Sequence, residues 1–177
     1  MLGEMHFMAA LTGDGESGRL IHFAWLFICL GLITALFKMF NRPENHDRLS
    51  LLPAMGFLLI PSVPILGAWC FIDMFMTAYF LGFVLIAGIS LKRGFSWRLA
   101  LIQAFCIGGC ISTKYTMLPL IGILGIIWML LTSFNRKPRD TGGAAGCLRI
   151  IMTGVGGLVM GSIWYLRNAC WTGNPFY

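Results

Sequence analysis

The chain has 177 residues, of which 58% are hydrophobic and 11% are charged, and its net charge is +6. Ordinary globular proteins are roughly 45–50% apolar and about 25% charged, so this composition excludes a soluble globular domain. It predicts instead one membrane-embedded domain over residues 1–177. Basic residues in such a protein report its topology first, so the positive charge predicts no nucleic-acid partner.

The first residues, up to Arg19, do not resemble a secretory signal peptide. Glu4 stands where such a peptide has a basic segment, and Asp14 and Glu16 interrupt any apolar core. The pattern predicts a short amphipathic stretch followed by a polar, glycine-rich turn.

Six apolar stretches follow, most of them close to the roughly 20 residues that a helix needs to cross a bilayer. They lie near residues 20–40, 51–67, 70–91, 98–113, 116–134 and 148–166. Pro53, Pro61 and Pro64 interrupt the second stretch and predict a kinked or partly re-entrant segment. The gap at 113–116 predicts a tight hairpin. The expected fold class is all-α, a polytopic membrane bundle of about six transmembrane helices.

The six cysteines and three histidines show no spacing typical of a metal site, so we expect no metal. Four cysteines lie within or against apolar stretches and are expected to pack as small apolar side chains. These four are Cys29, Cys106, Cys110 and Cys147. Cys70 and Cys170 differ from them, because both lie near predicted membrane ends.

Basic residues gather in alternate loops along the chain. The loops after the first, third and fifth apolar stretches hold ten of the 13 lysines and arginines. Because lysine and arginine accumulate in cytoplasmic loops, these loops are predicted to be cytoplasmic and both termini extracytoplasmic. The opposite side holds only Arg19, Lys114 and Arg167.

Three charged residues stand near the predicted outer ends of three stretches: Asp73, Lys114 and Arg167. An ionisable residue within a span is costly and suggests a function, whereas an aspartate at a helix N-terminus is also favoured by the helix dipole. In the alternative interpretation, Lys114 and Arg167 anchor helix ends at the lipid headgroups. Together they suit an anionic headgroup, most simply a phosphate. We expect the three to gather around the mouth of one cavity between helices.

Small residues predict close helix packing in two stretches. Gly108, Gly109 and Ser112 precede the predicted hairpin, and Gly157 and Gly161 have GxxxG spacing in the sixth stretch. Such positions let two helix backbones approach closely. We therefore expect these glycines to serve packing and not catalysis.

Four segments carry a resemblance to a known family. They are "GRLIHFAWLFICLGLITALF", "GAWCFIDMFMTAYFLGFVLIAG", "GGCISTKYTMLPLIGILGI" and "WYLRNACWTGNPFY". In this order they resemble segments of the GT-C glycosyltransferases of the protein-mannosyltransferase and aminoarabinose-transferase type. The last segment is the most specific, because it is similar to the family's WYxRNxxxTGNPxYP segment. The resemblance covers nearly the whole chain.

The resemblance implies a multi-pass enzyme of the cell membrane that transfers a sugar from a polyprenyl-phosphate donor on the extracytoplasmic face. The lipid-linked sugar is then a substrate, and no cofactor is implied. Asp73 matches an outer-face acid that positions donor or acceptor, and it is the one candidate catalytic residue. The substrate-binding residues that the resemblance implies are Lys114, Tyr115, Arg167, Asn168, Trp171 and Asn174.

The family's acidic motif has no match in this sequence. That motif lies in the first outer loop and is credited with catalysis, since a carboxylate there deprotonates or orients the acceptor hydroxyl. Glu4 lies where the tail of that loop would be, and no Asp-Asp or Asp-Glu pair is present. We therefore expect an internal portion of a longer enzyme, inactive by itself.

The alternatives are a small transporter, an assembly subunit or an inactive remnant. A transporter is expected to show internal repeats and a polar path at the bilayer midplane. The sequence has no convincing repeat, and Gln103 is nearly the only strongly polar residue deep in a stretch.

The topology can be tested with reporter fusions. Fusions at Asn45, Gly94 and Gly142 are expected to report a cytoplasmic position, because these residues lie in the three loops rich in lysine and arginine. A fusion after Tyr177 is expected to report the opposite side. An extracytoplasmic signal at any of the three internal positions would contradict the predicted topology.

Overall fold

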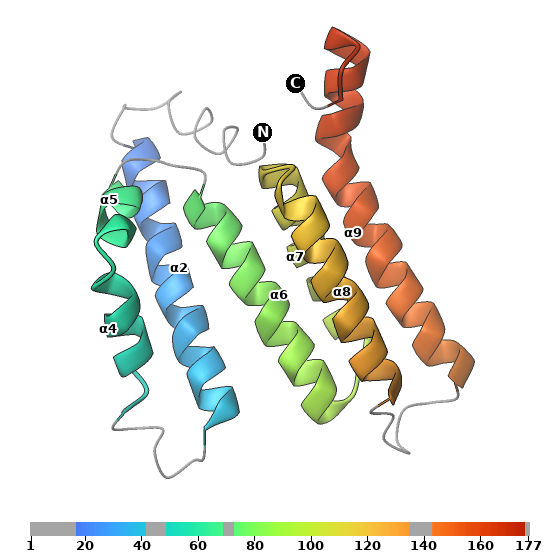
Figure 1. Ribbon diagram of the computed structural model, residues 1–177, viewed down its shortest axis with the longest axis horizontal. Coiled ribbons are helices and arrows are strands. Elements are labelled where there is room, and N and C mark those ends of the chain that lie inside the picture. The colour runs from blue at the N-terminus through green and yellow to red at the C-terminus, as the bar shows by residue number, and fades with distance from the viewer. Residues whose placement is uncertain (1–16, 42–48, 69–72, 135–142, 176–177) are drawn as a thin grey trace. The chain divides into compact units, whose positions relative to one another are not determined.

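The computed structural model describes residues 17–41, 49–68, 73–134 and 143–175, and within these ranges every regular element is a helix (Figure 1). The helices are α2 (Ser17–Phe40), α4 (Leu52–Leu58), α5 (Ser62–Ala68), α6 (Asp73–Arg93), α7 (Trp97–Thr113), α8 (Met117–Phe134) and α9 (Gly143–Thr172). The predicted all-α class is confirmed for these residues. Glu4 and Cys70 lie outside the described ranges.

Three helices are long and apolar enough to cross a membrane. Their apolar segments are Phe23–Phe40 in α2, Asp73–Arg93 in α6 and Gly146–Thr172 in α9. The apolar helices α7 and α8 have 17 and 18 residues, which corresponds to about 25 Å at 1.5 Å per residue. These lengths support a membrane protein, while the six spans and the outward-facing termini stay predictions.

The second apolar stretch forms two short helices separated by a break. Both α4 and α5 have seven residues, about 10 Å each, so neither reaches across a bilayer. Pro53 lies in the first turn of α4, which tolerates a missing N–H donor. Pro61 follows the end of α4, and a residue before proline avoids helical geometry. The expected interruption is confirmed, and 51–67 is not one continuous helix.

The helices divide into two compact units at the middle of α6. The first unit contains α2, α4, α5 and α6 up to Leu81; the second contains α6 from Gly82 onward with α7, α8 and α9. The prediction of one domain over the whole chain is not tested by this division. Each unit has its own packing, and the second carries most of the predicted site residues.

In the first unit, α2 packs against α5 and the first half of α6. Leu26, Cys29, Val63, Met74 and Ala78 form its buried core. The Cys29 thiol lies 3.6 Å from the Met74 carbonyl oxygen and donates to it. This confirms the expectation that the thiol is buried among apolar groups.

In the second unit, short connections set the order of α6, α7 and α8. Gly94 ends α6 with a φ of +89°, a conformation that glycine adopts without a steric penalty. The Ser96 hydroxyl then caps α7 by accepting from the Leu99 N–H at 3.4 Å. At the other end of α7, three residues separate Thr113 from Met117. The predicted tight hairpin is therefore confirmed.

The contact between α7 and α9 is the closest helix pairing in the second unit. A Cβ atom built at Gly157 would lie 2.5 Å from Ile107 Cγ2, and one at Gly161 would lie 2.8 Å from Ile111 Cγ2. A Cβ at Gly108 would lie 2.7 Å from Met160 Cβ. No side chain fits at these three positions without a shift of the helices. The predicted packing role of these glycines is confirmed.

Side-chain hydrogen bonds continue this pairing toward both ends of α7. At its start, Arg149 Nη1 donates to the Phe95 carbonyl oxygen, and both residues are buried. At its end, the Tyr165 hydroxyl donates to the Ile111 carbonyl oxygen at 2.7 Å. Residue numbers thus rise together along the two helices, so α7 and α9 run parallel.

α9 is longer than the sequence predicts. The expected stretch was 148–166, but the helix begins at Gly143 and ends at Thr172, a length of 30 residues. No proline interrupts it, and glycines within a membrane helix are tolerated when they serve packing. The last two turns therefore extend beyond the end of α7 (Figure 1).

The close pairing of α7 and α9 can be tested with a leucine at Gly161. Gly161→Leu is expected to destabilise the protein by about 1–3 kcal/mol or more, because the side chain would overlap Ile111. Unfolding of the purified protein by a denaturing detergent measures this change. Gly146→Leu, on the same helix with open space around the Cβ position, is the matched control. Equal stability of the two variants would contradict the pairing.

Candidate functional site

Lys114 and Arg167 lie at the same end of the α7–α9 pair. The contacts Ala100–Thr153, Ala104–Gly157 and Gly108–Gly161 all join residues 53 positions apart. Lys114 and Arg167 are separated by the same number of positions. Because parallel helices keep their register over such a short distance, the two cations stand at the same level.

The hairpin after α7 fixes the backbone that carries Lys114. This residue has extended backbone angles, φ −152° and ψ 125°, and its N–H lies 3.4 Å from the Cys110 carbonyl oxygen. Its own carbonyl accepts from the Met117 N–H at 3.0 Å. The side chains of Lys114 and Tyr115 are both exposed. The hairpin thus presents an exposed amine from a well-bonded backbone.

Arg167 lies between two tryptophan rings. Its Cζ atom is 4.8 Å from the ring centroid of Trp164 and 4.3 Å from that of Trp171. Positions three and four residues away share one helix face, so the continuation of α9 through Thr172 creates this stack. Each such cation–π contact at an exposed site contributes about 0.5–1 kcal/mol.

The two tryptophans differ in their exposure. A guanidinium binds phosphate oxygens in its own plane through paired N–H donors. Trp164 is buried, while Trp171 is 75% exposed. The Arg167 guanidinium thus contacts one buried ring and one exposed ring at the end of α9.

The Thr-Gly-Asn segment at residues 172–174 terminates α9. Gly173 has a φ of +71° and its N–H donates to the Ala169 carbonyl oxygen at 3.0 Å, as in a helix terminated by glycine. The Thr172 hydroxyl donates to the Asn168 carbonyl oxygen at 2.8 Å and lies 3.3 Å from the Asn174 N–H. The Thr-Gly-Asn turn therefore places Asn174, an exposed residue, next to the last turn of the helix.

Asp73 belongs to the first unit and is the first residue of α6. Its side chain is partly buried, and its backbone carbonyl accepts from the Thr77 hydroxyl at 2.7 Å. This position agrees with the alternative in which the helix dipole favours an aspartate at the N-terminus. Whether the carboxylate joins Lys114 and Arg167 stays a prediction.

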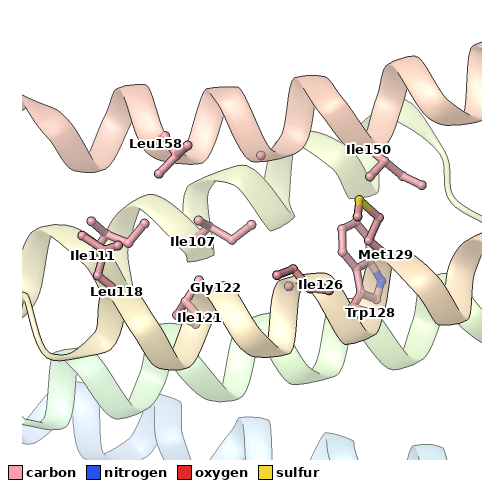
Figure 2. A pocket seen from close by; sticks show the side chains of 12 residues that line it. Ile107, Ile111, Leu118, Ile121, Gly122, Ile126, Trp128, Met129, Ile150 and Leu158 are labelled. Carbon is pink, nitrogen blue, oxygen red and sulfur yellow. The ribbon is translucent and has the colours of Figure 1, made fainter.

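An apolar groove lies between α8 and α9, with α7 as its floor. Its volume is about 320 Å³. Figure 2 shows Ile107 and Ile111 of α7 between Leu158 of α9 and Leu118 of α8. The lining residues are Ile107, Ile111, Leu118, Ile121, Gly122, Gly125, Ile126, Trp128, Met129, Ile150, Gly154 and Leu158. Three of them are glycines with open space at the Cβ position, which widens the groove.

The groove runs from the Lys114 hairpin toward the opposite end of α8. Ile111 and Leu118 line one end, and each is within four positions of Lys114. Met129 and Trp128 line the other end opposite Ile150 (Figure 2). The cation of the hairpin therefore stands beside one mouth of an apolar channel.

The sequence did not reveal this groove. Gly122, Gly125 and Gly154 are not distinguishable from packing glycines until their neighbours are known. Gln103, the polar residue expected deep in a stretch, is fully buried but does not line the groove. No described atom forms a hydrogen bond with its amide.

No family model, curated protein or solved structure matches this chain. Within the described residues, no group of three or more histidine, cysteine, aspartate or glutamate side chains is placed to hold a metal ion. The assignment of a function therefore depends on the groove and the residues at its end.

The common level of Lys114 and Arg167 can be tested by cross-linking. With the exposed Cys147 and Cys170 replaced by serine, Lys114→Cys paired with Arg167→Cys is expected to react with a dithiol reagent of about 10 Å span, close to the separation of packed helix axes. Mass spectrometry of the digested protein detects the bridge. Lys114→Cys paired with Leu148→Cys is the control, separated by about 28 Å along α9. Equal bridging in both pairs would contradict the register.

Proposed function

We propose that this protein binds a polyprenyl-phosphate-linked sugar in a cell membrane and belongs to a system that transfers the sugar on the extracytoplasmic side. The observation that carries the proposal is the apolar groove whose one end lies beside Lys114, at the level of Arg167. A ligand with a charged head and a hydrocarbon tail matches both features.

The charged end suits a phosphate. A phosphate carries negative charge and acceptor oxygens, which suit both an arginine and a lysine at the same end of the helix pair. Arg167 supplies the paired in-plane donors and Lys114 supplies a mobile point charge. Tyr115 follows Lys114 in the hairpin, and Asn168 and Asn174 lie at the same end of α9 as Arg167.

The groove suits a hydrocarbon tail better than a polar solute. Its lining is apolar, and the Trp128 indole N–H is already bonded to the Ser90 hydroxyl at 2.8 Å. A transport path for polar solutes requires polar groups along its length. The groove therefore favours lipid binding over the transporter alternative.

The sugar-transfer part of the proposal rests on the sequence resemblance. Lys114 and Arg167 lie in two of the four segments that resemble the polyprenyl-phosphate-dependent enzymes, and the segment with Arg167 is the most specific of the four. The acidic motif of that family has no match here, so the general base is not assigned to any residue of this chain. Asp73 is proposed to position the donor or acceptor and not to act as that base.

Substitution of the two cations tests the proposal. Lys114→Ala or Arg167→Ala is expected to weaken binding of a polyprenyl phosphate roughly ten-fold or more, because each charge-assisted contact contributes about 1.5–3 kcal/mol. Arg167→Lys is expected to recover only part of the loss, since the fork geometry is missing. Binding to protein in lipid nanodiscs, measured by tryptophan fluorescence or native mass spectrometry, gives the affinities.

Arg98→Ala is the matched control, because Arg98 is an exposed cation at the opposite end of α7. Its affinity is expected to equal that of the unaltered protein. Unchanged affinities of Lys114→Ala and Arg167→Ala would overturn the proposal. They would favour the alternative that these two cations anchor helix ends at the lipid headgroups.

A further inference from the structure

Three side chains line the groove at its end farthest from Lys114. We call this the end wall, and it consists of Trp128, Met129 and Ile150 (Figure 2). Trp128 and Met129 come from α8, and Ile150 stands opposite them on α9. Trp128 is the buried member, with 5% of its surface exposed.

Trp128 is held by contacts on more than one side. Its indole N–H donates to the Ser90 hydroxyl of α6 at 2.8 Å. Its ring meets that of Phe95 edge to face, with 4.9 Å between the centroids. The Phe95 carbonyl in turn accepts from Arg149 of α9. These contacts join α6, α8, α9 and the segment between α6 and α7, and they hold Trp128 in place.

The distance from the hairpin to the end wall limits the length of tail that fits. From Leu118 to Trp128 along α8, the groove extends for roughly 15 Å. An extended chain of about ten carbons, joined by C–C bonds of about 1.5 Å, fits within this length. A polyprenyl chain is much longer than this.

We infer that the end wall sets the length of hydrocarbon that the protein binds. The groove takes about the first ten carbons next to the phosphate, and the end wall turns the rest of the tail out between α8 and α9 into the bilayer. This inference rests on the proposed binding of a lipid phosphate near Lys114. It makes Trp128 a positioning residue for the tail.

The end wall affects where the tail lies more than how tightly the lipid binds. A tail that moves from the bilayer into an apolar groove exchanges one apolar environment for another, so little hydrophobic free energy is gained. The groove instead holds the first carbons at a fixed place, which fixes the phosphate at the level of Lys114 and Arg167. Affinity measurements with different tail lengths are therefore a weaker test than a measurement of where the tail lies.

Photolabelling with two alkyl phosphates measures this position. The near probe carries a diazirine about ten carbons from the phosphate, and the far probe carries it about fifteen carbons away. With the full chain in nanodiscs, the near probe is expected to label the end wall several-fold more strongly than the far probe, which should label lipid instead. Mass spectrometry of the digested protein locates the labelled residues.

Three variants sharpen the measurement. Met129→Ala opens the end wall without touching the bonds of Trp128, and it is expected to raise labelling by the far probe beyond Trp128. Trp128→Ala is expected to have the larger effect of the same sign if the variant folds. Gly125→Leu is expected to abolish labelling of the end wall, because the groove is filled. Gly31→Leu, on α2 with similarly open space, is the control for Gly125→Leu and is expected to change nothing.

The possible outcomes separate the two proposals. Both phosphate binding and the length limit are supported if only the near probe labels the end wall strongly and this label is lost in Lys114→Ala and Arg167→Ala. Equal labelling of the end wall by the two probes, still dependent on these cations, overturns the length limit and leaves phosphate binding intact. Labelling of the groove that does not depend on either cation, or no labelling there, overturns both.

Discussion

The close contact between α7 and α9 is the constraint on which the second unit depends. Gly108, Gly157 and Gly161 leave no room for a side chain between the helices, and in a membrane such packing replaces the hydrophobic effect as the main source of helix association. The two helices run parallel and in register, so matching residues of both helices lie at the same end of the pair. Lys114 and Arg167 therefore stand at the same level.

The same contact explains why a groove exists. Because α9 is drawn onto α7, it makes little contact with α8, and small residues on the facing sides of α8 and α9 leave the gap unfilled. At one end the gap is closed by Trp128 and its bonds to Ser90 and Phe95. At the other end it lies beside the Lys114 hairpin. The packing of α9 on α7 thus accounts for a groove with Lys114 beside one end and the end wall at the other.

The extension of α9 beyond α7 adds a second function to the same helix. The predicted apolar stretch ends at residue 166, whereas the helix continues through Thr172. Helical spacing then places Trp164 and Trp171 on either side of Arg167. An irregular tail would leave the arginine free to rotate toward solvent or headgroups. The helix holds it in one place, as a binding site requires.

The sequence by itself determined the helical class, the positions of four of the helices to within three residues, the proline break after Leu58 and the packing role of the GxxxG glycines. These depend on local properties: apolar length, proline geometry and the absence of a side chain. The tertiary structure alone decided that α7 and α9 run in register, that Arg167 is stacked between tryptophans and that Gly122, Gly125 and Gly154 line a groove. A glycine that packs and a glycine that borders a cavity look identical in a sequence, because the difference lies in what the neighbouring helix places against it.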